Sequence, residues 1–276
     1  MSEALTDDDS EALHAVAQHG GALCTVTAID GSWSRRMGAQ LAVLPDGSTR
    51  GSLADGCLER ALAAEAAIGG AARVLRYGEG SPFVDIRLPC GSGVEVLIDP
   101  APDRAAIAAT VDALTARRPA TLRTGDTPQG PFTRHYLPPL RLVVCGSGPE
   151  AVALDRLARA QGLSAELLLP LGEDGGTLGL GRAPHVTPDR WTAVAVLFHD
   201  HEWERGLLPW ALESQAFHVG AQGGKGAREA RAGWLSPEQM ARLKSPIGLF
   251  AHARTPSVLA LSVLAEIVAE YEKLLG

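Results

Sequence analysis

The chain has 276 residues, of which 46% are hydrophobic and 21% are charged, so the sequence predicts a globular protein of one large or two ordinary domains. Its formal net charge of −7 argues against nucleic acid and anionic membranes as partners. No apolar run is long enough to span a bilayer, and the acidic N-terminal residues do not resemble a signal peptide, so we expect a cytoplasmic protein with reduced thiols.

The first two elements are predicted from their residue patterns. Residues 9–19 have the pattern of a helix, with Asp9 or Ser10 as its cap and Gly20–Gly21 at its end. Residues 22–30 are rich in β-branched side chains and predict a buried strand.

Two adjacent arginines, Arg35 and Arg36, lie in the Gly-Ser loop that follows, ahead of a strand and a Pro-Asp-Gly turn at residues 45–47. A guanidinium group binds both oxygens of a phosphate or a carboxylate, so the pair is a candidate anion-binding element. The alternative is ordinary surface charge on a solvated loop.

A Gly-Ser-rich turn runs into an Ala-Leu-rich helix over residues 51–67. Asp55 is the predicted N-cap, which places Cys57 in the first helical turn. Unpaired N–H groups and the positive end of the helix dipole favour a thiolate there, whereas the Asp55 carboxylate opposes it. The alternative is that Cys57 is a small buried hydrophobe, as free cysteines often are.

The other cysteines are considered one at a time, because none has the CxxC spacing of a zinc site. Cys24 lies in the strand at residues 22–30 and is predicted to be core. Residues 83–100 predict two strands joined at a turn that contains Cys90. Gly91 in this turn allows backbone N–H groups to face a bound anion, and the alternative is a hairpin with a buried cysteine.

The first half ends with a predicted helix up to residue 118 and two short strand-like pieces. The doubled proline at Pro138–Pro139 is the predicted domain boundary, which gives domains of residues 1–138 and 139–276.

The second half opens with strand, glycine loop, helix and strand over residues 140–170, which predicts the start of a doubly wound fold. Gly146, Gly148 and Ala151 form a G-x-G-x-x-A motif, whose amides and helix N-terminus would face a phosphate. The second strand ends in Leu169–Pro170 and not in the acidic residue that commonly holds a nicotinamide ribose. This difference argues against ordinary NAD(P) use.

Histidines and carboxylates follow the next predicted strand, at the edge where ligands of this fold bind: His199, Asp200, His201, Glu202 and Glu204. These side chains resemble metal ligands. The alternative is a polar helix start whose acids stabilise the helix dipole.

The last predicted helix has Thr255 as its cap and Pro256 at its first position. Its broad apolar face is predicted to include Val258 and Leu261. We expect this helix to serve mainly in packing.

Short motifs recur along the whole chain, from about Ala22 to Tyr271. In the first half they are Gly31-Ser32, Arg35-Arg36, Gly38-Ala39, Gly51-Ser52, Gly56-Cys57-Leu58-Glu59, Cys90-Gly91 and the run from Val96 to Pro100. In the second half they are Gly146-Ser147-Gly148, His199-Asp200, and the runs Val219 to Gly223, Pro246 to Leu249, Thr255-Pro256 and Leu261 to Ile267. In this order and spacing the chain resembles the XdhC/CoxI-type accessory proteins of xanthine dehydrogenase and related molybdenum hydroxylases.

The resemblance implies an α/β protein, with a mixed α+β XdhC-type N-terminal domain followed by a Rossmann-like doubly wound C-terminal domain. It implies a chaperone and not an enzyme. Such proteins bind molybdenum cofactor (molybdopterin), assist its sulfuration with a cysteine desulfurase, and insert it into a xanthine dehydrogenase-like apoenzyme. They are commonly dimers, so a homodimer is expected.

The chemistry of this cargo can be matched to side chains. Cys57 or Cys90 would supply a soft thiolate to molybdenum or its sulfur, so both are candidate metal ligands. Glu59 would hydrogen-bond a pterin N–H group or move a proton. The other candidate contacts, mostly to the cofactor's phosphate, are Arg35, Arg36, Gly91, Gly146, Gly148 and His199.

Two departures from the family pattern keep alternatives open. The glycine loop reads Gly146-Ser147-Gly148-Pro149 where GAGH is usual, and the acidic residue after the second Rossmann strand is missing. A nicotinamide-dependent oxidoreductase using the second domain is therefore the alternative function. A metal-binding or thiol-redox protein is a third hypothesis.

Overall fold

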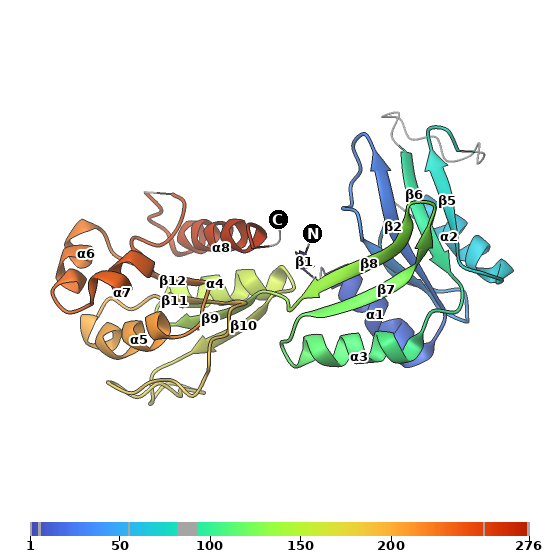
Figure 1. Ribbon diagram of the computed structural model, residues 1–276. Coiled ribbons are helices and arrows are strands. Elements are labelled where there is room, and N and C mark those ends of the chain that lie inside the picture. The colour runs from blue at the N-terminus through green and yellow to red at the C-terminus, as the bar shows by residue number, and fades with distance from the viewer. Residues whose placement is uncertain (1, 5–6, 55, 82–92, 251, 275–276) are drawn as a thin grey trace. The chain divides into compact units, whose positions relative to one another are not determined.

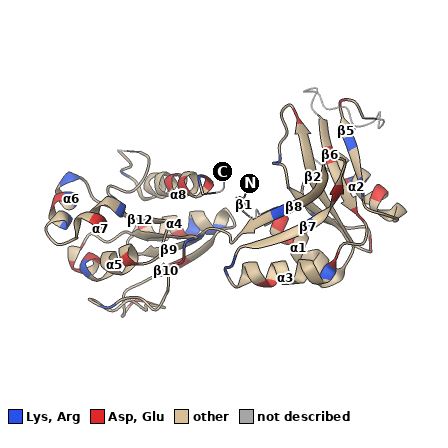
Figure 2. Cartoon of the chain, in the orientation of Figure 1, with Lys and Arg blue, Asp and Glu red and all other residues tan. Residues whose placement is uncertain are grey.

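The structure is a computed structural model that describes residues 2–4, 7–54, 56–81, 93–250 and 252–274. The chain divides into two compact units, Met1–Pro138 and Pro139–Gly276 (Figure 1). Acidic and basic positions are interspersed along the elements of both units (Figure 2). Among the described residues, no helix combines the length and the apolar character needed to cross a membrane.

A five-stranded antiparallel sheet forms the centre of the N-terminal unit. Its order is β4 (Thr49–Gly51), β3 (Gln40–Val43), β2 (Ala22–Asp30), β6 (Gly93–Asp99) and β5 (Arg73–Gly78). Side chains of β2 alternate between its two faces, as the pleat of a strand requires. Cys24 and Val26 pack with residues of α2 (Cys57–Ile68), whereas Leu23 packs with α1 (Asp7–His19) and α3 (Arg104–Thr115). Helices therefore bury both faces of this sheet.

A second, three-stranded sheet completes this unit, in the order β1 (Ser2–Ala4), β8 (Gly130–Leu137) and β7 (Ala120–Thr127). The two strand-like pieces predicted before the doubled proline are thus the antiparallel pair β7 and β8. Leu122 of β7 and Tyr136 of β8 enter the core beneath α1 and α3. This sheet closes the apolar face that α1 and α3 share.

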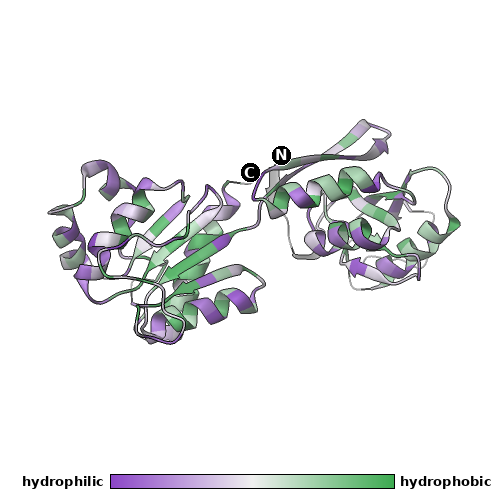
Figure 3. Cartoon of the chain, turned by 90° about the horizontal axis from the view of Figure 1, so that it is seen from below, coloured by the Kyte–Doolittle hydropathy of each residue, from purple (hydrophilic) through white to green (hydrophobic). Residues whose placement is uncertain are grey.

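The C-terminal unit is built on a parallel sheet in the order β10 (Ser164–Leu168), β9 (Arg141–Cys145), β11 (Thr192–Val196), β12 (His218–Ala221) and β13 (Leu243–Lys244). β11 is buried along its whole length, as a strand covered on both faces must be. The central strands of this unit are accordingly coloured largely as hydrophobic in Figure 3. The strand order reverses direction at β9, which is the topological feature that positions ligands in doubly wound folds.

Five helices cover this sheet among the described residues: α4 (Pro149–Ala160), α5 (His201–Glu213), α6 (Lys225–Ala232), α7 (Pro237–Arg242) and α8 (Pro256–Glu272). Helices α4 and α8 pack against each other. Apolar side chains of α5 fill a core with β9, β11 and β12. The Rossmann-like doubly wound architecture predicted for the second half is confirmed.

Several finer predictions need correction. Asp9 does not cap the first helix, which already begins at Asp7; its carboxylate is buried and accepts from Arg134 at 2.6 Å and from the Gln40 backbone N–H at 2.8 Å. Val258 and Leu261 are 42% and 51% exposed, although the sequence assigned both to the inner face of the last helix. The strand predicted at residues 83–88 lies outside the described residues.

His218 of β12 is a buried titratable group between two carboxylates of α8. Its Nδ1 lies 3.3 Å from Glu270 Oε2 and its Nε2 lies 3.8 Å from Glu266 Oε2. Burial lowers the pKa of His218 below its ordinary value, and the nearby Lys244 ammonium lowers it further, although both glutamates oppose the shift. The histidine is therefore held neutral in the folded protein.

Stability of the C-terminal unit should fall with acidity because of this histidine. Below about pH 6.5, the unfolded pKa, the unfolded chain binds a proton at this histidine, whereas folded His218 stays neutral. The free energy of unfolding therefore decreases as the pH falls from this value toward the lower, folded pKa. His218→Gln should flatten this part of the stability profile, measured by urea unfolding between about pH 5 and pH 8. An unchanged slope in the variant would contradict the assignment.

Candidate functional site

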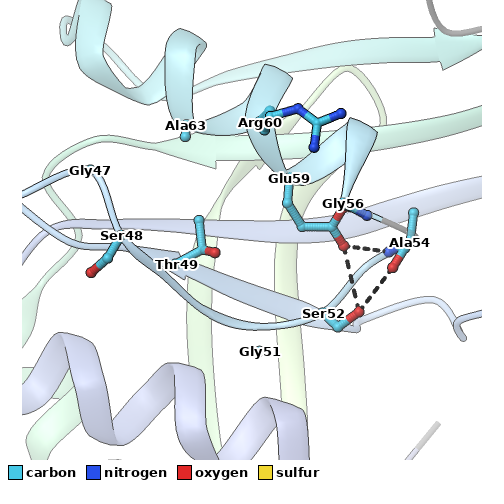
Figure 4. Close-up of a pocket in the computed structure, with 10 residues that line it drawn as sticks. All are labelled: Gly47, Ser48, Thr49, Gly51, Ser52, Ala54, Gly56, Glu59, Arg60 and Ala63. Atoms are coloured by element: carbon cyan, nitrogen blue, oxygen red, sulfur yellow. Dashed lines mark hydrogen bonds between the residues drawn. The ribbon is translucent and has the colours of Figure 1, made fainter.

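The turn that leads into α2 forms one wall of a cavity of about 370 Å³ in the N-terminal unit (Figure 4). Helix α2 begins at Cys57, which confirms that this cysteine lies in the first turn. The N-cap is Gly56 and not the predicted Asp55, which lies outside the described residues. Gly56 has a φ of 91°, a left-handed conformation that a side chain would disfavour. The cavity is lined by Gly47, Ser48, Thr49, Gly51, Ser52, Ala54, Gly56, Glu59, Arg60 and Ala63.

Glu59 organises the turn from the third position of α2. Its Oε1 accepts the backbone N–H groups of Leu53 at 2.8 Å and Ala54 at 2.6 Å, and its Oε2 accepts that of Gly56 at 2.7 Å. The carboxylate points toward the turn in Figure 4. Glu59 therefore fixes the backbone that forms the cavity wall, in the manner of a capping box.

The ionisation of Glu59 follows from the same contacts. Its side chain is largely buried, and burial alone would raise the pKa of the carboxyl group. The backbone N–H groups of Ala54, Leu53 and Gly56 outweigh this effect and hold the pKa of Glu59 below its ordinary value. The charged carboxylate is thus the form that the turn is built around.

Cys57 is exposed at the start of α2, directly after Gly56, which lines the cavity, although Cys57 itself is not one of the lining residues. The Arg60 guanidinium, one turn further along the helix, donates to Cys57 Sγ at 3.2 Å. An exposed sulfur atom is thereby paired with a cation that lines the cavity. The alternative of a buried Cys57 is wrong, whereas Cys24 is fully buried, which raises its pKa to about 12.

The two predicted anion-binding arginines face different partners. Arg35 is joined to the cavity wall, because its Nε donates to the Ser52 carbonyl at 3.1 Å and its Nη2 to the Ser52 hydroxyl at 3.0 Å. Arg36 instead lies 3.5 Å from the buried Asp9 carboxylate. Arg35 therefore supports the cavity, and Arg36 belongs to the contact between the loop and α1. Cys90 and Gly91 lie outside the described residues.

A second cavity, of about 440 Å³, lies at the carboxyl edge of the parallel sheet in the C-terminal unit. His199 lines this cavity, as its position directly after β11 predicts. The G-x-G-x-x-A loop follows β9 as predicted, and Gly148 is the N-cap of α4. A Cβ atom at Gly146 would lie 2.8 Å from the Leu197 carbonyl oxygen, so close approach of two backbones requires this glycine.

The loop chemistry gives no support to nicotinamide binding. Pro149 is the first residue of α4 and has no N–H group to offer a pyrophosphate. Glu150 follows it, and its Oε2 lies only 2.9 Å from where a Cβ atom on Gly148 would stand. A carboxylate thus covers the loop where the phosphate of a dinucleotide would need backbone donors.

The histidines and carboxylates considered as metal ligands form the polar start of α5, with Asp200 as its N-cap and Glu202 and Glu204 in its first turn. His199 is exposed, whereas the buried Glu204 carboxylate accepts from Arg231 Nε at 2.9 Å, has a second contact with Arg231 Nη2, and lies 2.9 Å from His201 Nδ1. No group of three or more metal-ligating side chains is gathered in the described part of the chain. The sequence did not identify Arg231, because the alternating charges of residues 225–231 are typical of a solvated helix.

Comparisons with known proteins agree with these two units. Residues 15–78 match the family described as XdhC and CoxI, and residues 142–267 match the XdhC Rossmann domain. The molybdenum cofactor insertion chaperone PaoD of Escherichia coli (strain K12) is 33% identical over 297 aligned positions, which cover 96% of this chain and 89% of that protein.

A solved structure shows the same fold. It is described as a xanthine dehydrogenase from Bacillus halodurans, is 20% identical, and superposes with a TM-score of 0.78 over 95% of both chains. The family-model matches in both halves and the relative at 33% identity along nearly the whole length confirm the predicted resemblance: the chain belongs to the XdhC and CoxI family.

Proposed function

We propose that this protein is a chaperone that binds molybdenum cofactor and delivers it to a molybdenum hydroxylase. The relative named as a molybdenum cofactor insertion chaperone supports this proposal, because it aligns with nearly the whole chain. The observation that carries the proposal further is the exposed Cys57 sulfur, held beside the Arg60 guanidinium, which lines the cavity that Glu59 braces.

The residues of the N-terminal cavity fit such a cargo chemically. Molybdenum and its terminal sulfur prefer soft ligands, which Cys57 would offer. The cofactor's phosphate and oxo groups are anionic, and the Arg60 guanidinium lines the cavity as a matching cation. A volume of about 370 Å³ falls within the range of small-molecule sites. Cys90 and Gly91 complete the proposed set by resemblance to the family.

The finer parts of the proposal come from the family resemblance. They are assistance in sulfuration of the cofactor, a cysteine desulfurase as a partner, a xanthine dehydrogenase-like apoenzyme as the recipient, a homodimer, and a cytoplasmic location. Each has its own measurement. Sedimentation of the purified protein tests the dimer, and co-purification with a desulfurase tests the sulfur donor.

The proposal is tested by mixing the purified chain with molybdenum cofactor, separating the protein by gel filtration, and assaying molybdenum and pterin in the protein fraction. We expect both to co-elute in a near-stoichiometric amount. Cys57→Ala should retain less than about a tenth of the molybdenum, because loss of a metal–thiolate contact removes a large share of the binding free energy. Circular dichroism should be unchanged, since Cys57 is exposed.

The matched control is Ser257→Ala, an equally small change at an exposed position in the first turn of α8. It should retain the cofactor like the wild-type protein. Absence of molybdenum and pterin from the wild-type fraction would contradict the chaperone function. Equal retention by Cys57→Ala and the wild type would contradict only the role of the thiol.

A further inference from the structure

An exposed apolar surface runs along α8 and the segment that precedes it. Four of the nine exposed large apolar side chains in the described chain fall within residues 249–261, so these side chains are concentrated and not scattered. They are Leu249, Phe250, Val258 and Leu261, which are 57%, 48%, 42% and 51% exposed. A gathering of apolar side chains on one face marks an interaction surface.

Helix α8 packs on α4 at the outside of the C-terminal unit (Figure 1). Val263 and Ile267, on the side toward its own unit, are fully buried. A helix has about 3.6 residues per turn, so the positions on the opposite side form one stripe. This stripe, here called the α8 face, is apolar along its length and exposed or partly exposed at every position: Val258, Leu261, Ala265, Val268 and Ala269.

Two hydrogen bonds bring more apolar surface beside the middle of α8. The Leu249 backbone N–H donates to the Ser262 carbonyl at 3.3 Å, and that of Phe250 donates to Ser262 Oγ at 2.7 Å. Ser262 directly follows Leu261 on the helix. The exposed Leu249 therefore adjoins the α8 face and widens it.

Opposite charges stand at the two ends of the α8 face. Arg254 precedes the Thr255 N-cap, and Glu272 is the last residue of the helix. Both are exposed, and no ion pair joins either of them to another described residue. In contrast, the Glu270 carboxylate of the same helix is 2.7 Å from Lys244. Lys273 follows Glu272 but lies about 100° further round the helix.

The α8 face is symmetrical about its own midpoint. In an antiparallel pair of α8 helices related by a two-fold axis at residue 263, positions equidistant from that residue oppose each other. Leu261 then faces Ala265 of the second copy, and Val258 faces Val268. The same register sets Arg254 against Glu272 at both ends. The small Ala265 near the axis allows the two helices to approach closely.

We propose that the α8 face binds a second copy of this chain across this two-fold axis. An isologous interface must complement itself, and here apolar positions meet apolar positions while each Arg254 meets a Glu272. A different partner would give no reason for this symmetry. Burial against a second copy also accounts for Val258 and Leu261, which have the character of core residues but are exposed in one chain.

The inference assigns a surface and a register to the homodimer, and in that respect it rests on the proposed function. Sedimentation of the full chain over a dilution series measures the dissociation constant of the dimer. We expect Leu261→Glu to raise it at least about a hundredfold, because two carboxylates are buried near the axis. Leu171→Glu is the matched control, since Leu171 is a 63% exposed leucine in a loop of the same unit. It should dimerise like the wild type.

A charge exchange tests the register. Arg254→Glu and Glu272→Arg should each weaken the dimer about tenfold, because each places like charges together at both ends of the interface. The double variant restores two opposite-charge pairs and should recover the affinity of the wild type. Recovery in the double variant is a result that a merely local effect of either residue would not give.

Disulfide cross-linking reads the same register directly. A mixture of Leu261→Cys and Ala265→Cys chains should form a linked pair on mild oxidation, identified by mass spectrometry of the joined peptides. The control mixture, Val258→Cys with Ala265→Cys, places the thiols at positions that do not oppose each other and should not link. Links in the control mixture at the same yield would overturn the register.

The outcomes separate this inference from the proposed function. A wild-type chain that sediments as a monomer would overturn the α8 interface, while its retention of molybdenum cofactor would still support the chaperone role. A wild-type dimer whose dissociation constant is unchanged in Leu261→Glu would keep the homodimer and overturn this surface. Unchanged circular dichroism of Leu261→Glu shows that a loss of dimer is not a loss of fold.

Discussion

Glu59→Ala should destabilise the N-terminal unit by about 2–4 kcal/mol, because it removes the acceptor of three backbone N–H groups at a largely buried turn. The charged acceptor makes each of these bonds stronger than a neutral one, but the turn can relax toward water, so their contributions do not add fully. The same loss should open the cavity wall and weaken retention of the cofactor.

Hydrogen exchange followed by mass spectrometry tests this prediction, because it measures the protection of individual amides in the turn. The amides of Leu53, Ala54 and Gly56 should exchange much faster in Glu59→Ala than in the wild type, while β9 and β11 in the other unit keep their protection. The matched control is Glu65→Ala on the same helix, where the carboxylate pairs with Arg73 at 3.0 Å near the surface. That change should cost less than about 1 kcal/mol. Equal exchange in the two variants would contradict the role of Glu59.

The effect of Glu59 also has a defined pH dependence. The folded pKa of Glu59 is lowered, so its contribution to stability is fully present above the unfolded value of about 4.3 and is lost as pH falls through the folded pKa. The stability difference between the wild type and Glu59→Ala should therefore narrow below about pH 4. A difference that is constant from neutral to acidic pH would show that the carboxylate charge is not what braces the turn.

The sequence predicts the helices and strands well where a single pattern governs them. The strand at residues 22–30 is found with the predicted bounds, and the strand–glycine loop–helix unit after Pro139 is found as predicted. The buried face of the last helix, α8, was predicted less well. Val258 and Leu261 are exposed because that helix carries apolar residues on more than one side, so the sequence pattern does not mark which side is buried.

The candidate sites were only partly predictable, because their partners are distant in the chain. The helical position of Cys57 follows from local sequence, and so does its neighbour three residues later, Arg60. In contrast, the local sequence around Asp9 predicts a helix cap. In the structure, its carboxylate instead accepts at 2.6 Å from Arg134, which is 125 residues further along the chain. Local rules identify caps and turns, whereas such a buried pair is set by how the sheets pack.

The two cavities differ in the same way. Glu59 follows Gly56 at the spacing of a capping box, although the sequence analysis assigned the cap to Asp55 and gave Glu59 a contact with the cofactor. Glu150 resembles an ordinary acid in the first turn of a helix, and only the structure shows that its Oε2 is buried and shares a cavity with Gln222. No local signal joins Glu150 to Gln222, because the rest of α4 and the whole of α5 lie between them in the chain.

Arg231→Met should destabilise the C-terminal unit by about 3–5 kcal/mol, because Arg231 and Glu204 are 0% and 1% exposed and the substitution leaves a buried carboxylate without its cation. The four tryptophans of this unit report the transition in urea: Trp191, Trp203, Trp210 and Trp234. The control, Arg228→Met on the same helix, removes an exposed guanidinium that donates only to backbone carbonyls, and should cost less than about 1.5 kcal/mol.

The double variant Arg231→Met with Glu204→Met distinguishes the ion pair from packing. If the cost of the single change comes from an uncompensated charge, removing both charges should recover much of the lost stability. Additive losses of stability in the double variant would show that the pair contributes through packing and not through its charges.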